Sequence, residues 1–155
     1  MQSTLTDKII HFLEQHHVEF QRKDHAPTPT SQDSARERGE PIKIGAKALL
    51  VKAGTEFVLC VLPADRRLDT KKVKTILNSK TLDFASKEEL FEKTGLIPGA
   101  VPPFGNLMGL KMIVDTALFE EEYMAFNVAT LTSSLKIKTV DYRRSVQPLI
   151  DSISG

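Results

Sequence analysis

The stretch Thr94-Gly95-Leu96-Ile97-Pro98-Gly99-Ala100-Val101-Pro102-Pro103-Phe104-Gly105 carries three glycines and three prolines in twelve residues. This composition excludes a regular helix or strand, because proline fixes φ near about −65° and removes a donor, whereas glycine permits positive φ. A tight surface connection is one interpretation. The apolar residues Leu96, Ile97, Val101 and Phe104 favour another, in which a rigid loop packs inward and presents its backbone amides beside a cavity.

Helical patterns occur on both sides of this loop. Apolar residues recur at helical spacing, and capping residues mark several starts. Helices are therefore predicted over 4–16 (start signals Thr4 and Asp7), 31–38 (cap Thr30 or Ser31, stop Gly39), 70–78 (cap Asp69), 87–93 (Ser86–Glu89 capping box) and 142–153 (cap Asp141, with Pro148 kinking or shortening it).

Strand patterns fill the rest of the chain. The clearest is a hairpin of two nearly all-apolar arms, 48–53 and 56–62, about Gly54-Thr55, which predicts a central position in the sheet. Further strands are predicted over 18–22, 81–85, 111–114, 123–128 and 137–140. The sum predicts one α+β domain over residues 1–155, with a mixed sheet of six or seven strands and four or five helices.

Composition narrows the class of protein. The chain has 155 residues, 41% of them hydrophobic, and a formal net charge of +1, which is typical of a globular protein and not of a general nucleic-acid binder. Its apolar runs are strand-length, and its N-terminus lacks a signal-peptide pattern, so we expect a cytoplasmic protein that does not enter a membrane. Cys60 lies in an apolar strand and is predicted to be buried. No metal or other cofactor is predicted, because no Cys/His spacing of the zinc type occurs.

One local run is basic. Between Arg66 and Lys80 six lysines and arginines are opposed only by Asp69. A solvated helix face is one interpretation of such a run, and a surface that contacts phosphates is the other. The second interpretation assigns nucleic-acid contacts to Arg66, Arg67 and Lys71.

Three features in this order resemble one family. They are Lys47 at the start of a hairpin strand, the Leu62-Pro63-Ala64-Asp65-Arg66-Arg67-Leu68-Asp69 connection, and the loop from Gly95 to Gly105. The chain resembles the YbaK / prolyl-tRNA synthetase-associated editing domain family over nearly its whole length. His25, Ala35, Ala46–Leu50, Asp115 and Phe126-Asn127 extend the resemblance.

The resemblance implies a mixed sheet curled into a partial barrel with helices outside, and an aminoacyl-tRNA deacylase acting in trans. The substrate would be a small amino acid such as Ala, Cys or Ser mischarged on a tRNA such as tRNA-Pro, and the partners would be the 3′ aminoacyl end of that tRNA and an aminoacyl-tRNA synthetase. Family roles fall on Lys47, which would contact the 3′-terminal phosphate, and on Gly99, in the Gly-x-x-x-Pro loop. Substrate contacts are implied for His25, Ala100, Val101, Pro102, Pro103, Phe104, Gly105, Asp115 and Asn127.

The residues themselves leave alternatives open. Lys47 could be an ordinary strand-end lysine, and His25 a turn histidine that bonds the backbone. After Asn127 many relatives continue with a glycine and a histidine-containing segment, whereas this chain reads Val128-Ala129-Thr130-Leu131-Thr132-Ser133-Ser134, in which Thr130 could supply a substrate hydroxyl contact. The rival hypothesis is a non-catalytic module that binds an aminoacyl-tRNA or nucleotide end and associates with a synthetase.

Overall fold

The structure is a computed structural model that describes residues 4–28 and 31–155. It is a mixed α+β fold. Its α-helices are α1 (Leu5–Gln15), α2 (Ser31–Arg38), α3 (Thr70–Leu77), α4 (Lys87–Thr94) and α5 (Thr139–Val146), with short 3₁₀ helices η1 (Ile42–Ile44), η2 (Gly105–Leu107) and η3 (Thr116–Glu120). Its strands are β1 (Gln21–Asp24), β2 (Ala46–Ala53), β3 (Glu56–Pro63), β4 (Asp83–Phe84), β5 (Lys111–Asp115), β6 (Tyr123–Asn127), β7 (Ser133–Lys138) and β8 (Leu149–Asp151).

The strands lie in two sheets instead of the single sheet that was expected. One sheet has the order β1-β7-β6 and is antiparallel; the other has the order β4-β2-β3-β5-β8 and is mixed. An isolated parallel bridge between Gly45 and Ala125 connects them. The sequence pattern could not reveal this division, because it depends on which strands pair over long distances. A curl of the strands into a partial barrel stays a prediction.

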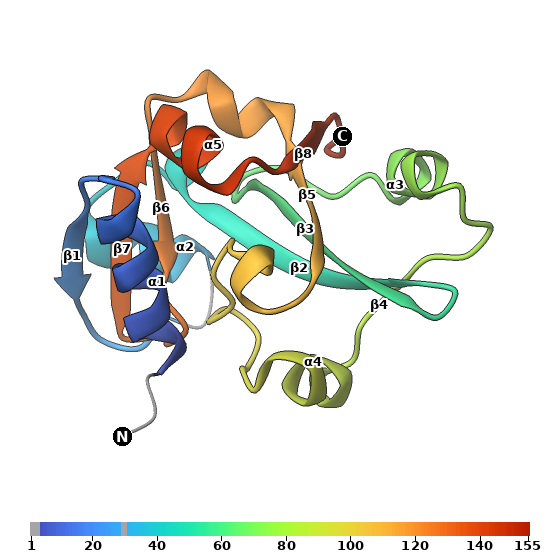
Figure 1. The fold of residues 1–155 in the computed structure, drawn as a ribbon, viewed down its shortest axis with the longest axis horizontal. Helices are drawn as coiled ribbons and strands as arrows, with labels where there is room; N and C mark the ends of the chain where they lie inside the picture. The colour runs from blue at the N-terminus through green and yellow to red at the C-terminus, as the bar shows by residue number, and fades with distance from the viewer. Residues whose placement is uncertain (1–3, 29–30) are drawn as a thin grey trace.

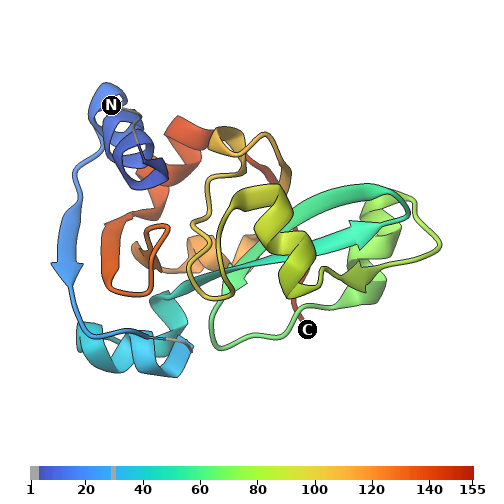
Figure 2. The same ribbon diagram turned by 90° about the horizontal axis from the view of Figure 1, so that it is seen from below.

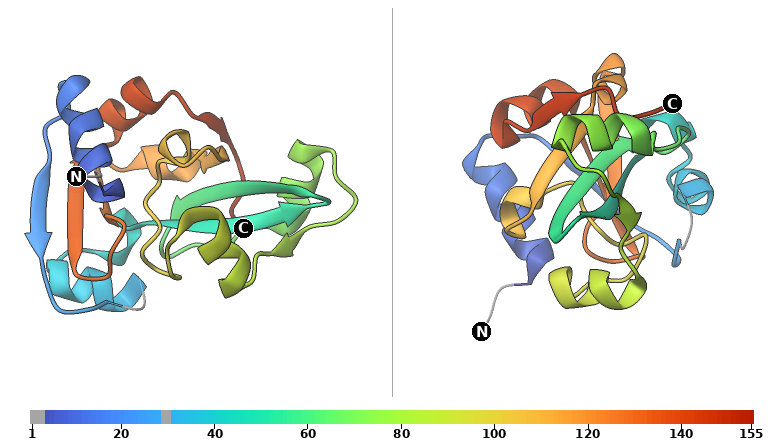
Figure 3. Two further views of the ribbon diagram at one scale, coloured as in Figure 1. Left: turned by 60° about the horizontal axis from the view of Figure 1, so that its bottom comes forward. Right: turned by 90° about the vertical axis from the view of Figure 1, so that its right-hand side faces the viewer.

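The two sheets lie side by side, the smaller at the left of Figure 1. Helix α1 lies across the face of the smaller sheet in Figure 1, and Figure 2 shows α1 and α2 near opposite ends of β1. The β2–β3 hairpin extends away from the smaller sheet, with α3 and α4 on opposite sides of it (Figures 1 and 3). The loop from Gly95 to Gly105 runs from α4 back toward the place where the sheets meet.

Local signals set most element boundaries. The Thr4–Asp7 and Ser86–Glu89 capping boxes form as predicted, and the Asp69 carboxylate accepts from the backbone of Lys71 and Lys72 at the start of α3. These side chains satisfy amide groups that have no partner in the first helical turn. The predicted cap at Thr30 falls outside the described residues, and so does the side chain of Ser31.

Four elements differ from their prediction. The strand expected over 18–22 is β1, which begins later and is exposed at all four positions, and the strand expected over 137–140 is β7, which ends at Lys138. Only Asp83–Phe84 of the segment 81–85 is a strand. The last helix begins before Asp141 and ends before Pro148, because proline cannot continue it, and β8 follows.

The core confirms two predictions about burial. Both hairpin arms contribute to it, and Cys60 is fully buried, so that burial raises the pKa of its thiol to about 12 and leaves it protonated at neutral pH. From Ala100 to Gly105 the loop is also buried, as its apolar residues predicted, whereas Ile97 is 52% exposed. No helix in the described part of the chain is long and apolar enough to span a membrane.

Gly105 allows the loop to pack closely against β5. A Cβ at this position would lie 2.8 Å from the Leu110 carbonyl oxygen and 3.0 Å from Met112 Cβ. We therefore expect Gly105→Ala to lower the free energy of unfolding by about 1–3 kcal/mol, measured by urea denaturation. The neighbouring exposed substitution Asn106→Ala should change it by less than about 0.5 kcal/mol. Equal effects of the two substitutions would contradict this account of the packing.

Candidate functional site

The Gly/Pro loop is held by its carbonyl groups at both ends of the Gly99–Pro103 segment. Asn127 Nδ2 donates to the Gly99 oxygen at 2.9 Å, and the Tyr142 hydroxyl donates to the Pro103 oxygen at 2.6 Å. Between these points Ala100 donates to the Ile97 oxygen at 3.1 Å. The loop is therefore fixed in shape by contacts with β6 and α5, which are distant in sequence.

Asn127 is the centre of a buried polar cluster. Its amide nitrogen also lies 3.3 Å from Thr28 Oγ1 and 3.4 Å from Ser34 Oγ, and its Oδ1 accepts from the Ser134 hydroxyl at 3.0 Å. Asn127 is 7% exposed, so the energetic cost of an unmade bond would be high. One amide thus joins β6 to β7, to α2, to the segment before α2 and to the loop.

Tyr142 fixes the other end of the segment from within the core. It is fully buried, and burial raises the pKa of its phenol, so the hydroxyl remains a donor at any ordinary pH. Its ring contacts Phe104 edge-on, and Phe104 in turn contacts Phe12 and Phe126. The family resemblance implied a substrate contact for Phe104, whereas its side chain lies in this aromatic core.

Gly99 itself has φ 88°, a conformation that favours glycine. The N–H groups of Gly99 and Val101 donate to no acceptor in the described part of the chain. Gly99 is exposed and Val101 is buried. Of these two groups, the Gly99 N–H lies at an exposed position, in the residue whose carbonyl Asn127 holds.

Lys47 lies on the strand next to Asn127. Strands β2 and β6 meet at the parallel Gly45–Ala125 bridge, and Lys47 and Asn127 each follow two residues later in the same direction. Residues two apart on a strand share a face, so each of the two side chains lies on the same face of its own strand as the bridged residue before it. The half-buried Lys47 ammonium makes no hydrogen bond or ion pair with any residue that the structure describes.

The charge environment of Lys47 comes from the connection after β3. Burial lowers the pKa of Lys47, the Asp65 carboxylate opposes that shift, and the Arg67 guanidinium adds to it. The β2–β3 register places Lys47 opposite Leu62, and Ala64 donates to the Gly45 oxygen at 2.7 Å. The structure therefore brings Arg67 close enough to Lys47 for their charges to interact.

Arg66 and Lys71, the other two residues predicted to contact nucleic acid, do not contribute to the charge environment of Lys47 in the same way as Arg67. Arg66 pairs with Glu120 at 3.6 Å on the surface, and Lys71 lies in the first turn of α3. Surface ion pairs of this kind contribute little to stability. Their role in binding RNA stays a prediction.

Asp115 lies at the end of β5 and is engaged by the C-terminal segment. Its Oδ1 accepts from the backbone of Ile153 at 2.9 Å, and its Oδ2 accepts from the Ser154 hydroxyl at 2.6 Å. Both oxygens of this buried carboxylate thus have partners within the chain. A contact of Asp115 with the substrate stays a prediction.

His25 follows β1 and contacts both the backbone and β7. Its Nδ1 lies 2.9 Å from the Ala26 oxygen, and its Nε2 lies 2.7 Å from Ser134 Oγ. Beside it, hydrogen bonds from Ser133 and Arg22 lower the pKa of the exposed Asp24 carboxyl. His25 thus joins the Asn127 cluster through Ser134, a residue that the sequence analysis did not single out.

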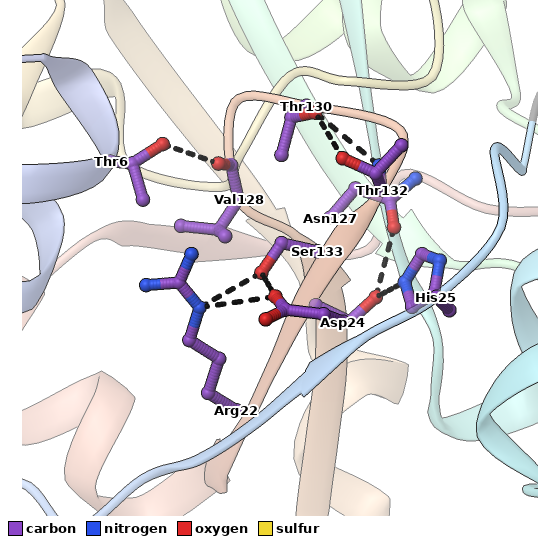
Figure 4. A network of polar contacts seen from close by, with 10 residues as sticks. Thr6, Arg22, Asp24, His25, Asn127, Val128, Thr130, Thr132 and Ser133 are labelled. Atoms are coloured by element: carbon purple, nitrogen blue, oxygen red, sulfur yellow. Dashed lines mark hydrogen bonds and ion pairs between the residues drawn. The ribbon is translucent and has the colours of Figure 1, made fainter.

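The turn after β6 contains the segment that departs from the family pattern. Ala129 has φ 66°, a conformation that residues other than glycine rarely adopt, and Thr6 Oγ1 donates to the Val128 oxygen at 2.8 Å. The Thr130 and Thr132 hydroxyls bond each other at 3.0 Å (Figure 4). A cavity of about 350 Å³ separates this turn from the loop, with a mainly apolar lining that includes Leu96, Ile97, Ala100, Thr130 and Leu131.

Three properties therefore define the site: a Gly/Pro loop fixed at two carbonyls, backbone N–H groups without an acceptor among the described residues, and a half-buried ammonium on a neighbouring strand. Residues 25–145 match the family described as "Aminoacyl-tRNA editing domain". The chain belongs to this family.

Three known proteins illustrate the relationship. The chain is 32% identical over 151 residues to the multifunctional Ser/Thr-tRNA deacylase ProXp-y of Escherichia coli, covering 94% of this chain and 90% of that protein. It is 33% identical over 86 residues to the proline–tRNA ligase of Fervidobacterium nodosum, covering 56% of this chain but only 15% of the ligase. A crystal structure presented as a candidate trans-editing enzyme for prolyl-tRNA synthetase shares the fold, with a TM-score of 0.83 at 19% identity, over 100% of this chain and 99% of that one.

The role of Tyr142 can be tested with the two tyrosines of the chain. Tyr142→Phe keeps the ring but leaves the buried Pro103 carbonyl without its donor, so we expect the free energy of unfolding to fall by about 1–3 kcal/mol. Tyr123→Phe is the control, because the Tyr123 hydroxyl makes no hydrogen bond in the described residues, and should change it by less than about 0.5 kcal/mol. Thermal or urea unfolding measures both. Indistinguishable stabilities would mean that Tyr142 does not hold the loop.

Proposed function

We propose that this protein is a trans-editing aminoacyl-tRNA deacylase, which hydrolyses the ester between a small, wrong amino acid and the 3′ end of a tRNA. One observation carries the proposal: the Asn127 amide fixes the Gly99 carbonyl beside a strand on which Lys47 has an ammonium without a partner in the described chain. The family relationship agrees with this chemistry.

The reaction is a hydrolysis of an ester. A water oxygen adds to the ester carbonyl, the carbon–oxygen bond to the ribose breaks, and the ribose oxygen leaves with a proton. The products are the free amino acid and a tRNA with an intact terminal hydroxyl. The neighbouring ribose hydroxyl assists, and no side chain of this protein is assigned as a general base.

The protein accelerates this reaction mainly by positioning. The Gly99 N–H is suited to receive the negative charge that develops on the ester oxygen, because the carbonyl of the same residue is held by Asn127 before the substrate binds. Alignment of water and ester in a fixed geometry reduces the barrier further. Gly99 is the position at which any side chain would intrude most directly.

Lys47 is proposed to hold the 3′-terminal phosphate, since a flexible ammonium can follow a phosphate oxygen. Arg67, whose charge acts on Lys47, would add a second cation along the same backbone. Arg66 and Lys71 would contact phosphates further along the acceptor stem. These contacts would weaken as salt concentration rises, because counterions are released when the RNA binds.

The substrate is proposed to be a small amino acid. The expected substrate is of the Ser, Ala or Cys type on a tRNA such as tRNA-Pro, and the name of the Escherichia coli relative, which carries Ser and Thr, supports the Ser part of this expectation. A synthetase pocket separates residues that differ by one methylene by only about 1–3 kcal/mol, so a second site that clears the error is needed. We propose that residues 1–155 form one editing domain. We also propose that the protein acts in the cytoplasm, with an aminoacyl-tRNA synthetase as a partner.

Single-turnover hydrolysis of a panel of mischarged tRNAs tests the proposal. We expect Ser-, Ala- or Cys-charged tRNA to be deacylated well above its spontaneous rate, and Lys47→Ala to lower that rate by at least about 10-fold, since a charge-assisted contact contributes about 1.5–3 kcal/mol. Lys8→Ala, at an exposed position of helix α1, is the control and should retain the rate within about twofold.

Two results would contradict the proposal. One is the absence of accelerated hydrolysis of every ester in the panel, even where a non-hydrolysable aminoacyl-adenosine analogue binds. The other is an unchanged rate in Lys47→Ala. The first of these would favour a non-catalytic binding module.

A further inference from the structure

We infer that His25 and Ser134 are positioning residues, which orient the Asn127 amide, and with it the Gly99 carbonyl, through hydrogen bonds that all run in one direction. The relay is His25 Nε2 to Ser134 Oγ at 2.7 Å, Ser134 Oγ to Asn127 Oδ1 at 3.0 Å, and Asn127 Nδ2 to the Gly99 oxygen at 2.9 Å. The hydrogen bonds of the relay do not depend on any activity, while the effect of the relay on hydrolysis rests on the proposed function.

The Gly99 end fixes the orientation of the Asn127 amide. A carbonyl oxygen can only accept, so the group facing Gly99 must be the amide nitrogen. Thr28 gives the same answer, because its hydroxyl donates to the Leu131 oxygen at 3.1 Å and therefore accepts from Asn127. The Asn127 oxygen must then face Ser134, which lies directly opposite it in the β6–β7 register.

The direction of the next two bonds follows. The Asn127 oxygen can only accept, so the Ser134 hydroxyl uses its single hydrogen there. Ser134 Oγ can then only accept from His25, so His25 Nε2 must carry a hydrogen. The relay therefore selects one of the two tautomers of a neutral imidazole.

A second contact of His25 would favour the other tautomer, so the tautomer that is present shows which contact prevails. His25 Nδ1 lies 2.9 Å from the Ala26 oxygen, which would favour a hydrogen on Nδ1. That tautomer would require Ser134 to donate to His25, and the Asn127 oxygen would then lose its donor. Asn127 and Ser134 are 7% and 2% exposed, whereas Ala26 is exposed and water can replace its contact. The buried end of the relay therefore determines the tautomer.

The functional consequence lies at the loop. Hydrogen bonds that run in one direction polarise one another, so the bond to Gly99 is stronger with the whole relay in place. This bond fixes the Gly99–Ala100 peptide group, which lies between the N–H groups of Gly99 and Val101 in the chain. The adjacent Ser133 hydroxyl donates to Asp24 at 2.8 Å and takes no part in the relay (Figure 4), which makes Ser133 a matched control.

Imidazole nitrogen NMR of the intact protein, recorded at a pH where the spectrum itself shows a neutral His25 ring, tests the relay directly. We expect the wild-type His25 ring to carry its hydrogen on Nε2. In Ser134→Ala the contact with Ala26 is the one that remains, so the hydrogen should move to Nδ1, while Ser133→Ala should keep it on Nε2. A wild-type hydrogen on Nδ1, or an unchanged tautomer in Ser134→Ala, would overturn the inference.

Kinetics then test the effect on the reaction. Ser134→Ala should lower the single-turnover rate by roughly threefold to tenfold with little change in KM, the effect of one neutral hydrogen bond. Adding His25→Gln to Ser134→Ala should cause no further loss, because both act through one path. Fully additive losses would overturn the positioning role. If no ester is hydrolysed faster than its spontaneous rate, the proposed function fails, and the NMR measurement of the His25 tautomer still tests whether the relay exists.

Discussion

The arrangement of this site depends on one buried amide. Asn127 gives two hydrogens and accepts one, and its partners come from four segments: the residues before α2, α2 itself, the Gly/Pro loop and β7. A loop with this many prolines can form few backbone bonds of its own, so its buried carbonyls need donors from elsewhere. Asn127 and Tyr142 supply two of those donors, and their bonds hold the loop in one conformation.

The bond between Asn127 and the loop also relates the fold to the position of Lys47. Two sheets meet at the Gly45–Ala125 bridge, and from that point one strand carries Lys47 and the other carries Asn127. The loop is bound to the second strand, so donors and ammonium are held in one framework. An ester hydrolase without an assigned general base depends on such positioning, because misplacement by about 1 Å can cost about 100-fold in rate.

Much of the fold could be predicted from short-range signals. The Thr4–Asp7 and Ser86–Glu89 capping boxes and the apolar hairpin lie within a few residues of the structure that they specify, and all were predicted correctly. The inward packing of the loop was also readable, because apolar residues in a Gly/Pro segment need a core. Strand β8 was missed, since three residues after Pro148 carry no periodicity of their own.

The candidate site was predictable only in part. Lys47, Gly99 and Asn127 were found through the resemblance, and the structure brings them to adjacent strands and one loop. Tyr142 and Ser134 were missed, because their partners lie 39 and 7 residues away and no local pattern marks such contacts. The alternation of β7 could have suggested that Ser134 faces inward, but only the register places it opposite Asn127.

The most direct test of this account is the single-turnover deacylation rate of Asn127→Ala, measured beside its thermal unfolding on the same preparation. The account predicts a folded protein whose rate falls by about 100-fold, because the Gly99 carbonyl loses the donor that fixes the loop. A folded variant that deacylates within about twofold of the wild-type rate would contradict it.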